Sequence, residues 1–200
     1  MLNRILPLCL ALLAFAFAVA PASAQSGEIQ QMLRQRDAEI KSILGPSGTP
    51  TAAQREKLRD VVNGVIDFEA MAKGALGPFW SDLSAAQRTA FVDVFGGVVR
   101  AQSLADLDLY RARVTYGDVD VNGASALART TARSGDVNAA VDYALAKKGD
   151  AWYVTDIVID GTGTVEGYAT SFQRVMKRQG AEAGYEKLMT SLRKRLARAG

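Results

Sequence analysis

The sequence contains no histidine, and its single cysteine, Cys9, lies in an apolar segment at the N-terminus. The absence of histidine excludes Ser-His-Asp and Cys-His catalysis, histidine-based proton transfer and nearly all zinc sites. No G-x-x-x-x-G-K-[ST] phosphate loop and no G-x-G-x-x-G dinucleotide motif occurs. We therefore expect a protein without catalytic residues, metal or cofactor.

Paired carboxylates are the one catalytic arrangement that these absences leave open. Asp156 and Asp160 are four residues apart on a predicted strand, which places both on one face. Asp160 precedes Gly161 and is expected in a turn. Asp156 belongs to an apolar alternation with Val154 and Val158, and a half-buried Asp is more often hydrogen-bonded to the backbone than catalytic.

The first 24 residues have the three parts of a secretory signal peptide. Arg4 gives a positive start, residues 5–19 form an apolar core, and Ala22-Ser23-Ala24 is an A-x-A cleavage site. The apolar run is too short for a stable transmembrane helix. We expect residues 25–200 to form a single exported, soluble domain, held together by its core alone because it has no cysteine.

Charge is nearly balanced over the whole chain but uneven along it. The formal net charge is +3, and eight Lys or Arg residues lie between Ser171 and Gly200 against only Glu182 and Glu186. The basic tail fits a solvated helix face whose cations suit the helix dipole. It also fits a surface for anionic lipid or an acidic partner. Nucleic acid is not expected as a partner, because the chain carries an export signal and no basic–aromatic surface pattern occurs.

Hydrophobic periodicity predicts helices at both ends of the chain and strands between them. Helices are expected at 28–44, from the capping box at 51–54, at 68–76 after the cap Asp67, at about 85–109 after the capping box at 84–87, at about 164–179 and at 181–198. Period-two segments predict strands at 114–121, 127–133, 139–145 and 152–159, the last two joined by a hairpin at 147–150. This order predicts an α+β fold with an antiparallel meander sheet of about four to five strands, covered on one face by helices.

The same residues carry a resemblance that extends over nearly the whole chain after the signal. They are Ile66-Asp67-Phe68, Met71-Ala72, Ala75-Leu76-Gly77, Trp80, Gln87-Arg88, Phe91 and Phe95, then Val141-Asp142-Tyr143-Ala144-Leu145, residues 152–158, Gly161, Tyr168, Phe172, Gly180 and Leu188. In these motifs the sequence resembles the MlaC-like, or toluene-tolerance, family of periplasmic lipid-binding proteins.

The resemblance implies a carrier without catalysis. Members of the family shuttle phospholipid across the periplasm, between an outer-membrane lipoprotein complex and an inner-membrane ABC transporter that contains an MCE-domain protein, and so maintain the lipid asymmetry of the outer membrane. It also implies that the acyl chains enter an apolar cavity enclosed between sheet and helices, while the headgroup stays near solvent.

Residues expected on or near the lining of that cavity come from both the helices and the sheet. They are Met71, Leu76, Phe95, Val98, Tyr143, Val154, Val158, Tyr168 and Phe172. Phe68 and Trp80 are expected to hold helices together instead. Large apolar residues at helical spacing are in general more often core than binding site, so the resemblance alone favours the lining.

One departure from the family pattern leaves the lipid open. Where relatives often have Ser-Leu and, further on, Tyr-Arg, this chain has Thr162-Gly163-Thr164-Val165 and Tyr168-Ala169. A hopanoid or another lipid is therefore an alternative cargo. Two other classes of function remain: a non-catalytic adaptor of the cell envelope that docks through its basic last helix, and an enzyme that uses Asp156.

Overall fold

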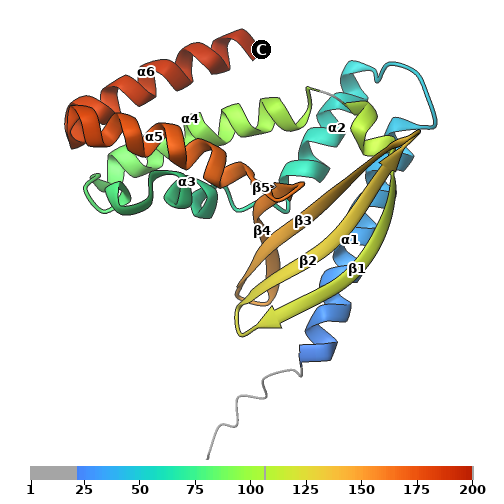
Figure 1. Ribbon diagram of the computed structural model, residues 1–200. Coiled ribbons are helices and arrows are strands. Elements are labelled where there is room, and N and C mark those ends of the chain that lie inside the picture. The colour runs from blue at the N-terminus through green and yellow to red at the C-terminus, as the bar shows by residue number, and fades with distance from the viewer. Residues whose placement is uncertain (1–21, 106, 200) are drawn as a thin grey trace, which may run out of the picture.

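The computed structural model of the protein describes residues 22–105 and 107–199 (Figure 1). The predicted signal peptide lies almost entirely outside the described residues. The helices are α1 (Ala22–Leu44), α2 (Ala52–Asn63), α3 (Phe68–Leu76), α4 (Ala85–Ser103), α5 (Thr164–Gln179) and α6 (Ala181–Ala199), with short 3-10 helices η1 (Gly77–Trp80) and η2 (Leu107–Arg111). The strands are β1 (Arg113–Asn122), β2 (Ser125–Ser134), β3 (Val137–Lys148), β4 (Ala151–Ile159) and β5 (Thr162–Gly163). The α+β fold is as predicted.

The sheet is an antiparallel meander in the order β1-β2-β3-β4-β5. Glycine makes its turns possible: Gly123, Gly135 and Gly149 each have φ near +60° and open two-residue hairpin loops. The short strand β5 was not predicted from the sequence. Asp160, at φ 48°, lies in the turn before it, as expected, and accepts a hydrogen bond from the Ala140 amide at 2.9 Å.

Helix starts follow the predicted caps. Capping boxes at Thr51 and Ser84 open α2 and α4, and the Asp67 side chain accepts from the Ala70 amide at the start of α3. The predicted helix 85–109 is too long, because α4 ends at Ser103 and the chain turns into η2. The turn places Leu107 in the core, whereas Leu109, the last residue of the predicted helix, is 66% exposed.

An extra residue in β4 reverses the side-chain alternation and corrects one prediction. Ala144 pairs with Asp156 but Leu145 pairs with Val154, so Thr155 is a β-bulge. As a result Asp156 and Val158 lie on the face opposite Val154, not in one apolar alternation with it. Ile157 takes the inward position and packs in the cluster that contains Val154.

Buried apolar residues form three clusters. The helical cluster joins α3, α4, α5 and α6, the sheet cluster joins α1 to one face of the sheet, and a third cluster joins the end of α1 to α2 and Leu107. We call helices α3 to α6 the helical part. In Figure 1 the helical part lies beside the β4 edge of the sheet, while α1 runs along the sheet. Helices thus cover one face of the sheet, and a separate helical part lies next to it.

Candidate functional site

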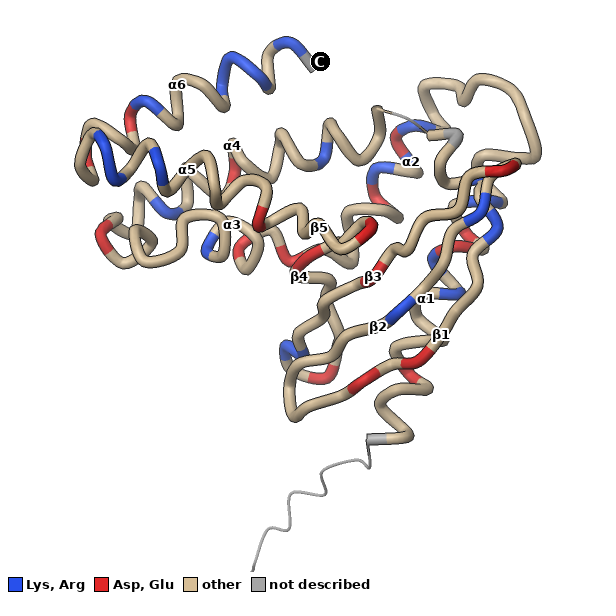
Figure 2. The backbone as a smooth tube through the Cα atoms, viewed as in Figure 1, with Lys and Arg blue, Asp and Glu red and all other residues tan. Residues whose placement is uncertain are grey.

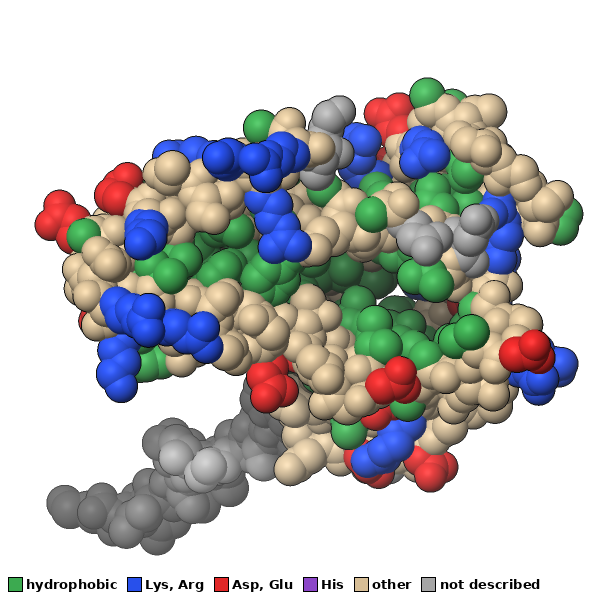
Figure 3. Space-filling view, turned by 45° about the horizontal axis from the view of Figure 1, so that its top comes forward, with side chains coloured by type: hydrophobic (Ala, Val, Ile, Leu, Met, Phe, Trp, Pro, Cys, Tyr) green, Lys and Arg blue, Asp and Glu red, His purple; other side chains and the backbone are tan. Residues whose placement is uncertain are grey.

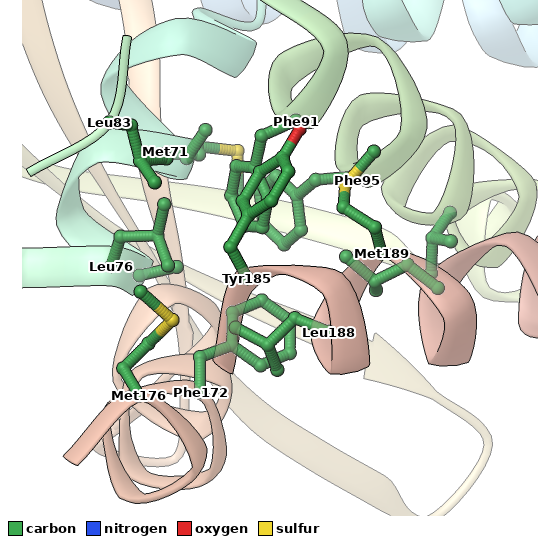
Figure 4. Packing of buried hydrophobic residues seen from close by; sticks show 14 of the residues in the cluster. Met71, Leu76, Leu83, Phe91, Phe95, Phe172, Met176, Tyr185, Leu188 and Met189 are labelled. Carbon is green, nitrogen blue, oxygen red and sulfur yellow. The ribbon is translucent and has the colours of Figure 1, made fainter. Parts of the chain in front are cut away.

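Three aromatic rings lie in the helical cluster (Figure 4), and a fourth, Tyr168, packs against it. Phe91 and Phe95 of α4 stack with ring centroids 5.7 Å apart, and Phe172 of α5 meets both edge-on at 5.9 Å. Tyr168, one turn earlier on α5, meets Phe95 edge-on at 5.0 Å. Edge-on and offset contacts are the favoured geometries for aromatic pairs. These rings make a rigid wall between α4 and α5.

The facing surface comes from the inward face of the sheet. Tyr143 and Ile157 are paired neighbours on β3 and β4 and pack against the sheet cluster. The next pair on the same face, Val141 and Ile159, belongs to none of the three clusters, and Ile159 is 51% exposed. The inward face of the sheet therefore continues as apolar surface beyond the part that α1 covers.

The 3-10 helix η2 brings Tyr110 close to Tyr143 of this sheet face. Burial raises the pKa of Tyr110 to about 12, and the nearby Tyr143 adds to the rise, whereas a hydrogen bond to Ser103 lowers it. Arg111 fixes η2 by donating to the carbonyl oxygens of Gly45 and Gly48 at 3.1 and 2.7 Å. Both tyrosines are neutral at physiological pH and act as weakly polar wall residues.

The segment between α2 and α3 joins the helical part to the sheet. Ile66 forms a parallel bridge with Val154, and the Asp67 amide donates to the Val154 carbonyl at 2.8 Å. The Asp67 carboxylate is buried and forms an ion pair with Lys148 at 2.6 Å. Ile66 packs against both the helical and the sheet cluster. The two parts are therefore joined at this edge of the sheet.

A hollow opens between the helical part and the sheet, and hydrophobic side chains gather inside it (Figure 3). Lys and Arg side chains border it on the helical side, and Asp and Glu side chains border it on the side of the sheet. Figure 2 shows that basic residues predominate along α5 and α6, whereas the strands carry both basic and acidic residues. The hollow is thus apolar inside and charged at its rim.

The predicted lining residues fall into three groups. Met71, Leu76, Phe95, Val98 and Phe172 are buried together in the helical cluster, with the half-buried Tyr168 packed against it. Val154 and the half-buried Tyr143 lie in the sheet cluster. Val158 lies on the other face of the sheet and is not brought together with the rest. The expected role of Phe68 and Trp80 fits their positions packed at the edge of the helical cluster.

Sequence reasoning missed three polar or half-buried groups near these residues. The Tyr168 hydroxyl donates to the side-chain oxygen of Gln102, a residue of the predicted helix 85–109 that no motif singles out. The Arg195 guanidinium lies 5.7 Å from the centre of the Tyr168 ring. Tyr110 had no motif of its own. No local sequence signal could have found these neighbours, because α4, α5 and α6 meet only in the folded chain.

Asp156 has a structural role at the start of α5. Its carboxylate accepts from the amides of Ile157 and Val165 at 2.8 and 3.0 Å. Burial raises the pKa of Asp156, and the backbone hydrogen bonds oppose the rise. Within the described residues, no group of three or more His, Cys, Asp or Glu could hold a metal ion.

Another recess of about 420 Å³ lies between α1 and α2, and charged residues such as Glu39, Lys57 and Asp60 line it. Charged side chains lie among its apolar lining residues Ile43 and Val61. Across the described part of the chain, no helix is both long and apolar enough to span a membrane.

Comparison with known proteins agrees with this architecture. The model of the MlaC protein family matches residues 24–194. Among solved structures, the fold is similar to a phospholipid-binding protein from Ralstonia solanacearum, determined in complex with a phospholipid, with a TM-score of 0.70 and 24% sequence identity over 90% of this chain and 99% of that chain. Comparison with curated proteins gave no significant match. The chain therefore belongs to the MlaC protein family.

Proposed function

We propose that this protein is a soluble periplasmic carrier that holds the acyl chains of a phospholipid in the hollow between the helical part and the sheet. The observation that carries the proposal is an open hollow with a hydrophobic interior on a MlaC fold. A solved protein of the same fold contains a phospholipid, which supports this cargo. The export signal predicted at residues 1–24 supports the compartment.

The energetic demand on such a carrier explains why it needs a deep apolar site and no reactive groups. Two long acyl chains contain roughly 30 methylenes, each costing about 0.8 kcal/mol in water, or on the order of 25 kcal/mol together. A carrier must shield nearly all of this surface. Apolar walls on both sides can do so, and neither a catalytic residue nor a cofactor contributes to it.

We further propose that the loaded protein moves lipid between an outer-membrane lipoprotein complex and an inner-membrane ABC transporter with an MCE-domain subunit, maintaining outer-membrane lipid asymmetry. Family membership is the support for these partners. A transfer assay tests this step: protein loaded with fluorescent phospholipid should pass it to the purified MCE-domain protein of the same organism, and retention of all lipid by the carrier would contradict it.

The cargo is tested by native mass spectrometry of protein produced in a bacterial periplasm with its own signal. We expect a mass increase that matches one phospholipid species. Apo protein alone, together with no uptake from added vesicles, would refute the carrier. A polycyclic hydrocarbon mass instead of a phospholipid would identify the hopanoid alternative.

A variant that fills the hollow separates carrier from adaptor. Val141→Trp enlarges a half-buried side chain on the inward face, next to the exposed Ile159. We expect it to fold and to lose most of its bound lipid. Val137→Trp is the matched control, because Val137 starts the same strand and is 69% exposed. If both variants retain lipid equally, the acyl chains lie elsewhere.

A further inference from the structure

The two C-terminal helices carry the excess positive charge of the chain. Helices α5 and α6 contain eight Lys or Arg against three Glu, a net charge of +5. Because the whole chain carries only +3, the rest of it carries −2. Figure 2 shows the basic residues along both helices. The positive charge of this protein is therefore concentrated on one pair of helices, which pack against each other.

On both helices the cations lie opposite the buried residues. In α6, Lys187, Lys194 and Arg198 follow one another at intervals of seven and four residues, so they form one stripe, on the side away from the buried residues of that helix. In α5, Arg174 and Arg178 are one turn apart and lie opposite its two buried residues. Figure 3 shows Lys and Arg side chains gathered over the helical part in one view. We call these five residues the basic face.

No acidic side chain neutralises the basic face. All five of its residues are exposed. In the described part of the chain the ion pairs are formed by other cations, Arg129 and Lys148 among them, and by none of these five. Exposed charges of one sign attract a surface of the opposite sign, and salt screens this attraction. The basic face is therefore available to an anionic partner.

The kind of partner follows from what the basic face lacks. Protein–protein interfaces have a buried core that is apolar and enriched in aromatic residues, with polar residues at the rim. The large apolar residues exposed in the described part of the chain are Leu109, Val137 and Ile159, and none of them lies on α5 or α6. A protein partner would find no apolar core there. A layer of anionic lipid headgroups needs none, because each Lys or Arg close to it adds its own attraction.

We propose that the basic face is a docking site for the surface of an anionic lipid bilayer, on which the protein lies without inserting. This inference goes beyond the proposed function, because it concerns how the protein approaches a membrane and does not depend on what the hollow contains. A few cations without an apolar anchor give weak, reversible and salt-sensitive binding. Such binding suits a protein that has to leave the membrane again with its cargo.

Co-sedimentation with vesicles tests the docking site. Wild-type protein is mixed with phosphatidylcholine vesicles that contain or lack phosphatidylglycerol, at low and at high salt. The main variant combines Lys187→Gln, Lys194→Gln and Arg198→Gln. We expect wild-type protein to sediment with the anionic vesicles only, and high salt to release it. The triple variant should bind them roughly 30- to 100-fold more weakly, because three separate attractions are lost.

Two further variants separate the basic face from overall charge. The matched control combines Arg55→Gln, Lys57→Gln and Arg59→Gln, which removes the same three positive charges from exposed positions of α2. We expect it to bind anionic vesicles within about threefold of wild type, because the distant charges are screened. Arg174→Gln with Arg178→Gln tests α5 independently and should weaken binding about tenfold.

The same measurements contain the results that would overturn the docking site. These are no sedimentation of wild-type protein with anionic vesicles at low salt, equal binding to neutral vesicles, or equal losses in the α2 and α6 variants. Binding to poly-L-glutamate but not to vesicles, lost in the α6 variant, would identify an acidic protein as the partner instead. Uptake of fluorescent phospholipid from neutral vesicles tests the carrier separately: we expect equal uptake by wild type and the α6 variant, and no uptake by either would refute the carrier but not the docking site.

Discussion

Truncating Phe95 tests whether the aromatic residues form the wall or contact the cargo. The Phe95 side chain has 0% exposure and meets Phe91, Phe172 and Tyr168 at centroid distances of 5.7, 5.9 and 5.0 Å. Removing a buried ring loses its transfer free energy and leaves a cavity between rigid helices. We expect Phe95→Ala to lower the free energy of unfolding by about 3–5 kcal/mol.

Urea unfolding of delipidated and lipid-loaded protein measures this loss. A wall residue costs the same in both forms, because ligand stabilisation depends only on ligand concentration and affinity, which the variant leaves unchanged. Total stability of a domain is about 5–15 kcal/mol, so Phe95→Leu, with a smaller expected loss, keeps the test possible if the alanine variant unfolds. A loss below about 1 kcal/mol in the delipidated protein, combined with loss of lipid binding, would show that Phe95 is part of the lipid contact and not of the wall.

Three further predictions address the supporting structure. Gly184→Ala should lower stability by about 1–3 kcal/mol in thermal unfolding, because its new Cβ would lie 2.9 Å from the Met176 Cα where α5 and α6 meet. The control is Gly167→Ala on α5, whose new Cβ meets nothing within 4 Å. It should raise stability by about 0.5–1 kcal/mol in the same measurement. Asp67→Ala should cost about 1–3 kcal/mol in urea unfolding, because it removes the α3 cap and leaves Lys148 unpaired; a cost equal to that of an exposed Asp→Ala control would contradict this role. Burial raises the pKa of Asp156 in the folded state, so its contribution to stability is present below its unfolded pKa and is lost as the pH rises through the raised value. Asp156→Asn should therefore gain stability relative to wild type as the pH rises above the ordinary Asp pKa of about 4 in urea titrations, with lipid binding unchanged. Loss of lipid binding in that variant would revive an enzymatic or direct ligand role for Asp156.

The sequence predicted the elements well because their signals are local. The caps at Thr51, Asp67 and Ser84 act within three residues, and the glycine of each hairpin acts within its own turn. The end of α4 was not predicted, because the apolar residues beyond Ser103 continue the helical period up to Leu109. There tertiary burial of Leu107 and the hydrogen bonds of Arg111 outweigh the local pattern.

The bulges show why the site was predicted only in part. In β1 the extra residue falls at Gly117 and Asp118, where an added Cβ at Gly117 would lie 3.3 Å from the Arg129 carbonyl oxygen. It keeps Tyr116 and Val119 on one face although they are three residues apart. In β4 the bulge at Thr155 carries no glycine and no turn residue, so alternation placed Val158 on the wrong face. Register depends on the partner strand, which one segment alone does not specify.

The buried and half-buried aromatic residues divide the site into a wall and a mouth. Phe91 and Phe95 are fully buried without any ligand, so a cargo can reach them only if helices separate. Tyr168 packs against the helical cluster and Tyr143 against the sheet cluster, and both are only half-buried, so we expect them to contact acyl chains before the buried rings do. Because the two parts are joined along the edge at Ile66 and Asp67, widening at the opposite side would enlarge the hollow without breaking the aromatic wall. Lipid uptake should therefore change the fluorescence or crosslinking of residues at Tyr168 and Tyr143 before it changes the packing of Phe95.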